Sequence, residues 1–386
     1  MVFTRLRALC GNNGSVTPMI FFLTIGLLGM TLAMMNLVHE YFVVSAKDAD
    51  AVVALNLAEA AVDKAVWHLS REPNRRNFSA ETNVPLDVGT YSIVSLTPLE
   101  NGNLRIITEG YVPNATSPRR AMVRLLVELA PVYSKPFAGA AIGDQGVPVA
   151  NGNTDSYDSR LGPYGGSNVG FQGSVYTNST DPGSIYIGPN GHVGGDVYYP
   201  PGGSPAVVEN RGTISGQIIE STAETSFVPF DVPSNAVEIP PITNNRVLSA
   251  GTYVIRANPA IDLRGNKSLT CLGPVVLYID GNANIGGNGI VTAGNLPRNL
   301  IIYGLSNCRA INISGNGALY AAVYAPNADI DLNGGGSQGV VFGSLAGQRV
   351  SFQGNGTIIH YDISLRDLQG VIQRYKVARW VKLRTE

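Results

Sequence analysis

Residues 283–316 read ANIGGNGIVTAGNLPRNLIIYGLSNCRAINISGN, and a short element occurs near each end of this stretch. The element is an apolar residue, any residue, a glycine, and a polar residue or a second glycine, as in IGGN at 285–288 and ISGN at 313–316. Its copies indicate a structural period, because the steps between them are 22, 21, 49, 22, 28, 19 and 20 residues. The apolar positions of the copies are Phe171, Val193, Ile214, Leu263, Ile285, Ile313, Leu332 and Phe352.

A step near 21 residues is typical of a solenoid in which short strands alternate with sharp turns. One repeat alone cannot bury its inward side chains, whereas stacked repeats build a continuous core and pair each strand with its neighbours. We therefore predict a mainly β protein whose residues 140–361 form a right-handed parallel β-helix (a solenoid) of about eight to ten coils. The competing architectures are a β-propeller, with blades of about 40 residues, and a β-sandwich.

The composition excludes several classes of protein. Charged residues make up 14% of the chain and hydrophobic residues 44%, which argues against disorder. The 45 glycines keep no three-residue period, which excludes collagen, and three cysteines are too few for a disulfide scaffold. A net charge of −1 offers no basic field, so we expect no nucleic-acid partner. Four scattered histidines disfavour a metal or catalytic site built from histidine, and we expect no metal and no cofactor.

Residues 16–38 contain no charged side chain, and about 20 helical residues cross the hydrocarbon core of a bilayer. The stretch is longer than the roughly 7–15-residue apolar core of a cleaved secretory signal, so we predict a retained transmembrane anchor. Arg5 and Arg7 precede it, whereas residues 39–50 are acidic on balance, which places residues 1–15 in the cytoplasm. The expected location is a bacterial inner membrane crossed once, with the C-terminal domain periplasmic or extracellular. The alternative is a buried core helix.

The helix is expected to continue beyond the membrane, because residues 41–69 contain no glycine or proline. Apolar residues recur there at steps of 4, 3, 4, 3 and 4, which makes one narrow stripe along a helical stalk over 39–72. This stripe either packs on the chain's own small domain or assembles with neighbouring helices. The residues assigned to helix packing and assembly are Ala51, Leu55, Ala58, Glu59, Val62, Ala65 and Leu69.

Three runs with strand character follow at 89–96, 104–111 and 120–129, separated by turn-forming residues. They predict a small antiparallel sheet within residues 78–132 that packs on the outer half of the long helix. At the other end of the chain, residues 362–386 are locally basic. We predict that a short helix and a strand at 375–383 cap the open end of the β-helix, since an uncovered end would expose unpaired backbone.

A short basic leader with Gly14, the apolar span and LNLAEAAVDKAVWHL at 55–69 together resemble PilX-type type IV pilus assembly proteins, which are pilin-like. The resemblance covers residues 10–130. It implies a pilin-like shape, pilin or minor pilin partners, and a possible leader cleavage between Gly14 and Ser15. Met19 would be the fifth residue after such a cut, where type IV prepilins carry glutamate.

Three further segments, DSYDSRLGPYGG at 155–166, VYAPNADIDLNGGG at 323–336 and GNGTIIHYD at 354–362, resemble a β-helical domain of unknown function. That domain is attached to pilin-like N-termini. The segments are also similar in texture to bactofilin-type polymer-forming repeats. This resemblance supports the architecture more than a function, because the domain carries no established activity.

Candidate ligand-binding residues lie in the same segments. Asp155 and Asp158 fall in a loop rich in serine, tyrosine and glycine, whereas Asp329 and Asp331 lie two apart on a predicted strand and would both face outward. Tyrosines of the early coils offer flat apolar faces for adhesive contacts. The alternatives are solvated carboxylates and ordinary coil packing, and we assign no catalytic residue. The candidate ligand surface consists of Asp155, Tyr157, Asp158, Tyr164, Asp329 and Asp331.

These patterns predict a membrane-anchored, pilin-like structural or adhesive component of a type IV pilus-like filament or of the cell envelope, and not an enzyme. Its expected partners are the lipid bilayer, pilin or minor pilin subunits, the pilus assembly machinery, and an extracellular polysaccharide or a host or surface ligand. The alternatives are a membrane-tethered polysaccharide-binding or polysaccharide-degrading β-helix, and a polymer-forming scaffold. Cys271 and Cys308 would share the oxidising side of the membrane, and whether they form a disulfide stays open.

Overall fold

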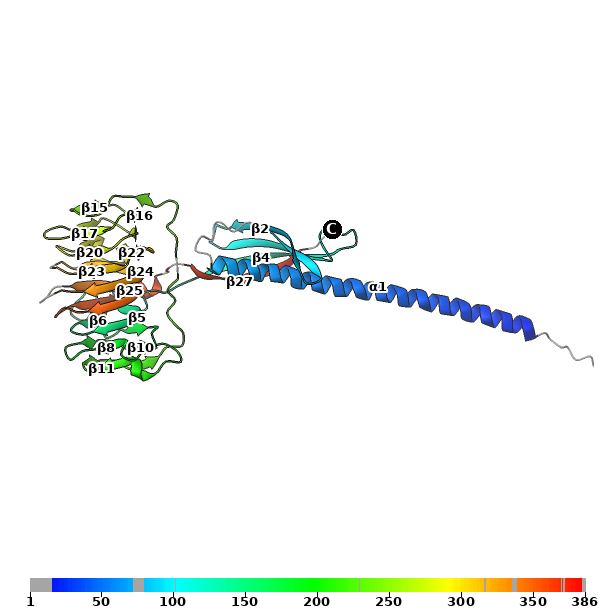
Figure 1. The fold of residues 1–386 in the computed structure, drawn as a ribbon, viewed down its shortest axis with the longest axis horizontal. Helices are drawn as coiled ribbons and strands as arrows, with labels where there is room; N and C mark the ends of the chain where they lie inside the picture. The colour runs from blue at the N-terminus through cyan, green and yellow to red at the C-terminus, as the bar shows by residue number, and fades with distance from the viewer. Residues whose placement is uncertain are drawn as a thin grey trace, which may run out of the picture. The chain divides into compact units, whose positions relative to one another are not determined.

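The computed structural model describes residues 16–71, 80–100, 102–228, 230–315, 317–334, 339–368, 370 and 372–383. It confirms a mainly β protein with one long N-terminal apolar helix (Figure 1). The chain divides into two compact units. Unit 1 comprises residues 1–69, 77–130 and 376–386, and unit 2 comprises residues 70–76 and 131–375. The predicted leader, with Gly14 and Ser15, lies outside the described residues.

The elements of unit 1 are α1 (Val16–Arg71), β1 (Glu81–Leu86), β2 (Gly89–Pro98), β3 (Leu104–Val112), β4 (Ala121–Tyr133) and β27 (Ile372–Leu383). Those of unit 2 are β5 (Ala141–Val149), β6 (Asn153–Tyr157), β7 (Val175–Thr177), β8 (Ile185–Ile187), β9 (His192–Val193), β10 (Val197–Tyr199), η2 (Pro205–Val207), β11 (Val208–Asn210), β12 (Thr213–Ile214), β13 (Ile218–Glu220), β14 (Val237–Glu238), β15 (Arg246–Leu248), β16 (Gly251–Ile255), β17 (Ile261–Leu263), β18 (Leu269–Cys271), β19 (Val275–Ile279), β20 (Ala283–Ile285), β21 (Ile290–Thr292), η3 (Ala293–Asn295), η4 (Pro297–Asn299), β22 (Leu300–Gly304), β23 (Ala310–Ile313), β24 (Leu319–Leu332), β25 (Val340–Phe352), β26 (Ile358–Asp362) and η5 (Ile363–Asp367).

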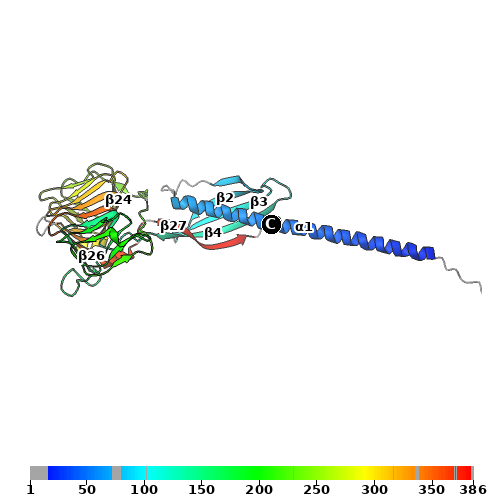
Figure 2. The same ribbon diagram turned by 60° about the horizontal axis from the view of Figure 1, so that its bottom comes forward.

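Unit 1 is a five-stranded sheet packed on the second half of α1. The strand order is β1-β2-β3-β4-β27, and the first four strands pair antiparallel in sequence order. Helix and sheet are in close contact at Gly110, where a Cβ atom would overlap the backbone oxygen of Ala54. Beside it, the Thr108 hydroxyl donates a hydrogen bond to the backbone oxygen of Ala58 at 3.0 Å. Small residues on both surfaces therefore allow this contact. Figure 2 shows the sheet lying along the helix.

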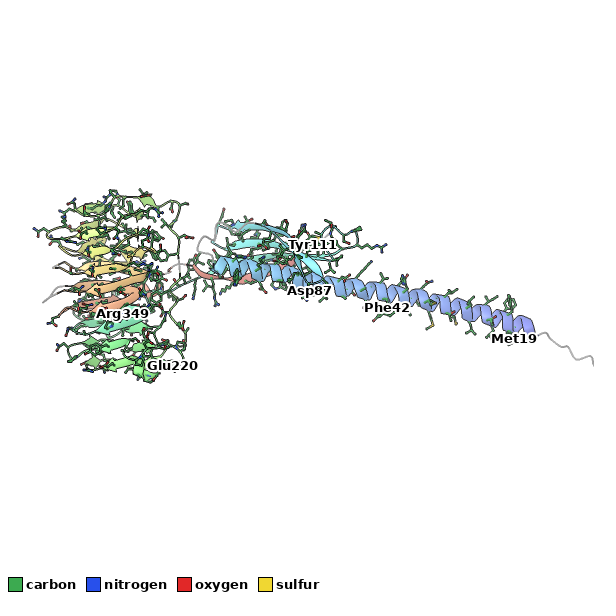
Figure 3. The ribbon with its side chains drawn as sticks, viewed as in Figure 1. Met19, Phe42, Asp87, Tyr111, Glu220 and Arg349 are labelled. Atoms are coloured by element: carbon green, nitrogen blue, oxygen red, sulfur yellow. The ribbon has the colours of Figure 1, made fainter. Side chains whose placement is uncertain are left out.

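The two halves of α1 have different surroundings within unit 1. Every described side chain from 19 to 44 is exposed, including Phe22 at 73% and Phe42 at 66%. Figure 3 shows Met19 and Phe42 on this bare half. From 54 to 69, in contrast, one face of the helix is buried. Among the described residues, α1 is the one helix long and apolar enough to cross a membrane, with a mean hydropathy of 2.0 over its best window.

The C-terminal strand lies elsewhere than the sequence predicts. Instead of capping the repeat domain, β27 is an edge strand of the unit 1 sheet beside β4. Together with β4 and α1 it lines a groove of about 190 Å³, to which Val377 and Trp380 contribute from β27 and Leu125 from β4. The residues between β4 and β27 all belong to unit 2. Unit 2 is therefore inserted between two neighbouring strands of unit 1.

Strands of unit 2 pair in parallel along three ladders, which we name A, B and C. Ladder A runs through Ile218, Val197, Val175, Ala141, Leu345, Val323, Ile302, Leu277, Tyr253 and Val237. Ladder B runs through Ile214, Val193, Thr154, Ile359, Val341, Leu319, Ile290, Leu269 and Arg246. Ladder C runs through Asn210, Ile187, Val149, Phe352, Leu332, Ile313, Ile285 and Leu263. Most of these side chains are buried in one hydrophobic cluster.

The repeats do not stack in the order in which the chain makes them. Strand β25 pairs with β24 on one side and with β5 on the other, so the last repeat lies against the first. The ends of the stack are formed by the repeat with β13 and the repeat with β14. Figure 1 labels β11 near one of these ends and β15 near the other. The C-terminal end of unit 2 thus leaves from the middle of the stack, which is the physical reason why the predicted cap at 362–386 cannot cover an open end.

The recurring sequence element marks strand ends. In seven copies the apolar residue is the last residue of a strand, and the glycine that follows allows the turn. Val193 and Ile214 end strands of ladder B, whereas the copies from Leu263 onward end strands of ladder C. The step of 49 residues, from Ile214 to Leu263, therefore includes a change from ladder B to ladder C as well as an insertion. The remaining copy differs, because Phe171 lies outside a strand and is 68% exposed.

The chain between β13 and β14 connects the two ends of the stack, and its residues Phe227, Val228 and Phe230 pack on a row of tyrosines. Tyr278, Tyr303 and Tyr324 stand in register on the outer side of ladder A. The ring of Phe230 lies 5.0–6.1 Å from all three rings, measured between centroids. The Tyr324 hydroxyl also donates to the backbone oxygen of Val228 at 3.2 Å. These contacts hold the connection along the stack.

The two cysteines of unit 2 are buried and free. Burial raises the pKa of the Cys271 and Cys308 thiols to about 12. Both thiols are therefore expected to stay neutral and unreactive towards a thiol reagent at pH 9 in the folded protein, where an exposed thiol is largely ionised. Unfolding in denaturant should release two equivalents within minutes. Fast labelling of the folded chain at either cysteine would contradict the expected burial.

Candidate binding surfaces

The predicted assembly stripe is divided between two environments. Ala58, Val62, Ala65 and Leu69 are buried in the packing of α1 within unit 1, so they cannot bind another subunit in this conformation. Ala51 and Leu55 are half-buried, and Glu59 is exposed. Of the two interpretations of the stripe, packing on the chain's own sheet thus accounts for its C-terminal part.

Asp155, on β6, belongs to a cluster that the chain assembles from residues 205 positions apart. One oxygen of its carboxylate lies 2.6 Å from Nδ1 of His360, on β26, and the other accepts a hydrogen bond from the Tyr164 hydroxyl at 2.6 Å. His360 is 7% exposed. Burial, together with the hydrogen bond to Asp155, raises the pKa of Tyr164. Both carboxylate oxygens are therefore engaged, and the cluster ties the first repeat to the last.

Aromatic rings extend this cluster along the outer side of ladder B. Tyr320, Phe342 and His360 occupy neighbouring positions on adjacent strands. The ring centroid of Phe342 lies 4.6 Å from that of Tyr320 and 4.8 Å from that of His360. The ring of Tyr164 packs on His360, with 3.8 Å between the two centroids. Tyr157 is 3% exposed and packs edge-on against Phe342. Two predicted ligand residues, Tyr157 and Tyr164, are thus packing partners, of which Tyr157 is buried and Tyr164 half-buried.

Asp158 organises the loop that follows β6. Its carboxylate accepts hydrogen bonds from the Arg160 guanidinium at 2.7–3.2 Å, and these bonds lower the pKa of Asp158. The amide of Asn168 joins the loop by donating to the backbone oxygens of Asp158 and Gly162. Arg160 also donates to Asp367 at 3.0 Å. The predicted ligand carboxylate therefore has a structural role in this conformation.

Asp329 and Asp331 lie apart from the Asp155 cluster, on the outer side of ladder C. Both project outward, because Ile330 and Leu332 between and beside them are fully buried. Asp329 is exposed and stands opposite Arg349, and Asp331 is half-buried and stands opposite Ser351. The structure thus divides the six predicted ligand residues into two groups on different sides of the stack.

The sequence did not identify His360 and Phe342 as members of a cluster. His360 is one of the four scattered histidines of the chain, and nothing near it in the sequence indicates a partner. The alternation in GNGTIIHYD could have indicated that His360 faces outward on a strand. Its partner Asp155 could not be inferred, because stacking order decides which repeat lies beside it. Among the residues that the structure describes, no three His, Cys, Asp or Glu side chains come together in a way that could hold a metal ion.

One part of the chain matches a known family model. Residues 243–368 match a family model described as a domain of unknown function (DUF7305), which covers a third of the chain. No curated protein matches the chain. Among solved structures, the chain is similar to the competence-associated pilin ComZ from Thermus thermophilus, with 13% identity over 86% of this chain and 97% of that one. The TM-score of 0.28 is too low for this similarity to show a shared fold.

Proposed function

We propose that this chain is a membrane-anchored, pilin-like protein that displays a large parallel β-helix outside the cytoplasm as a structural, non-enzymatic component of the envelope or of a filament. The observation that supports the proposal is the division of α1. Its first half exposes apolar side chains on all sides, and its second half packs under a sheet of the same unit. A helix that is apolar all round requires an apolar environment, and a bilayer supplies one for about 20 residues.

The displayed unit is proposed to be a right-handed parallel β-helix with three faces. Three continuous parallel ladders, with inward apolar residues and turns between them, support this architecture. Because unit 2 is inserted between β4 and β27, both of its connections lead to adjacent strands of one sheet. Such an insertion allows the sequence and the length of the β-helix to change without interrupting the helix that anchors it.

The anchor can be tested by placing charges in the exposed half of α1. Leu28→Arg combined with Leu32→Arg is expected to move the protein from the membrane to the soluble fraction, because each arginine near a bilayer centre costs about 2.5–3.5 kcal/mol. Native protein should resist salt and carbonate washes and dissolve in detergent. Val247→Arg is a matched control, since Val247 is 61% exposed on unit 2. Native protein that stays soluble without detergent would contradict the proposal.

Whether the leader is removed distinguishes a subunit that enters a filament from a protein that stays tethered to the membrane. Intact mass and N-terminal sequencing of the membrane-extracted protein are expected to show a mature end at Ser15 if the chain enters a pilus-like filament. An intact Met1 would instead favour a permanent membrane tether, and the filament part of the proposal would be wrong. The membrane fractionation above would be unaffected by either result.

A further inference from the structure

The groove beside β27 has an apolar floor and two exposed walls, and all of its lining residues belong to unit 1. Leu125 and Val127 of β4 form the floor and are each 1% exposed. One wall is α1, and the other is β27, where Val377 is 46% and Trp380 is 53% exposed. Large apolar side chains exposed beside a groove mark a surface that another molecule can cover.

The two walls of the groove carry opposite charges. Glu59 and Asp63 line it from α1, one helical turn apart, and both are exposed. On β27, the exposed Arg379 follows Val377 by two residues and shares its face of the strand, because side chains alternate between the two faces. None of these three charged side chains forms an ion pair with a described residue of unit 1, so all three charges are available to a partner.

This pairing of charges selects the occupant. An acidic segment would be attracted by Arg379 and repelled by Glu59 and Asp63, and a basic segment would meet the reverse. A second copy of this chain, in contrast, presents both charges side by side. A twofold rotation about an axis parallel to α1 lays the α1 wall of one copy against the β27 wall of the other. The opposite charges then meet at the same height, because both walls line one groove.

We propose that two copies of this chain associate through the groove as a twofold dimer. Glu59 and Asp63 of each copy face Arg379 of the other copy, and Trp380 of each copy packs on the α1 wall of the other. Every contact forms twice in such an interface, which closes the assembly at two copies. A head-to-tail arrangement would instead leave one acidic wall and one basic wall unpaired at its ends and would continue into an open chain.

The inference goes beyond the proposed function, because it names a second copy of the chain as the partner of unit 1. It also agrees with the proposed anchor. An axis parallel to α1 keeps the exposed apolar halves of the two helices pointing the same way, so both can enter one bilayer. Two copies anchored in one bilayer have a raised effective concentration, and a small interface can then suffice.

The dimer is tested with the full chain in detergent, by sedimentation equilibrium, which measures the mass of the assembly. Arg379→Glu and Glu59→Arg should each weaken dimerisation by at least about tenfold, because like charges then meet twice in the symmetric interface. An equimolar mixture of the two variants should restore the dimer, since each altered charge then faces its opposite on the other chain. Arg309→Glu is the matched control, because Arg309 is an exposed arginine of unit 2, and it should dimerise as the native chain does.

Four outcomes would overturn the proposal. These are a native chain that sediments as a monomer, single variants that dimerise as the native chain does, a mixture that stays monomeric, and a mass well above two copies. Thermal unfolding of each variant is compared with that of Arg309→Glu, and Asp63→Arg replaces Glu59→Arg if that variant does not fold. The assay contains no bilayer, so its failure leaves the membrane anchor untouched, and the fractionation experiment tests the anchor separately.

Discussion

Gly110→Ala is expected to destabilise unit 1 by about 3 kcal/mol, although it adds a single methyl group. The new Cβ would overlap the backbone oxygen of Ala54 and lie 2.7 Å from the backbone nitrogen of Ala58. Backbone atoms of a packed helix cannot move aside as a side chain can, so α1 must separate from β3. The hydrogen bond from Thr108 to Ala58 would be lengthened as well.

Hydrogen exchange can localise this effect, because the protein has two units and need not unfold in one step. Amides of β2, β3 and β4 should lose protection in Gly110→Ala, while amides of unit 2 keep theirs. Gly29→Ala is the matched control, since a Cβ there meets no atom within 4 Å. Equal protection of the sheet in both variants would show that helix and sheet are not in close contact at Gly110.

Ending the chain after Gly370 is expected to unfold the sheet of unit 1 and to leave unit 2 intact. The truncation removes β27, which covers one edge of β4 and contributes Val377 and Trp380 to the apolar groove beside Val62. Residues 80–130 should become sensitive to protease, because the exposed edge and the lost apolar cover both favour opening. Limited proteolysis followed by mass spectrometry identifies the cut sites.

A chain that ends after Leu383 is the control for this truncation, because it keeps all of β27. It should resist protease as the native chain does. The opposite pattern, with cuts in residues 208–220 or 237–248 at the ends of the stack, would show that the C-terminal residues protect unit 2. That result would restore the cap that the sequence predicts and would contradict the strand order described here.

Local features of the chain were predictable because they depend on neighbouring residues. The absence of glycine and proline from 41 to 69 predicted a helix, and α1 ends at Arg71, one residue before the predicted end of the stalk. The run at 104–111 is strand β3. Turn-forming glycines after Ile285 and Ile313 marked the ends of β20 and β23. In each case the signal, either the period of the side chains or a turn-forming residue, is contained in a stretch of about ten residues.

Sites that combine distant segments were not predictable in the same way. Asp155 and Tyr157 lie in one segment of the sequence, but their partners His360 and Phe342 come from the other end of unit 2. Asp329 and Asp331 were predicted to face outward, yet only the strand register shows that Asp331 stands opposite Asn312, which itself stands opposite Asn284. A single strand shows which face a residue occupies but not what lies on the next strand.

The amino-acid sequence alone determined the apolar span, the length of the helix, the repeat and the positions at which strands end. Only the tertiary structure decided that the last repeat lies against the first, that the chain between β13 and β14 joins the two ends of the stack, and that β27 completes the sheet of unit 1. The physical reason is that every repeat presents the same backbone donors and acceptors and similar inward apolar residues. The residues of one repeat therefore do not specify which other repeat it pairs with. The order of stacking follows from the packing of the whole chain.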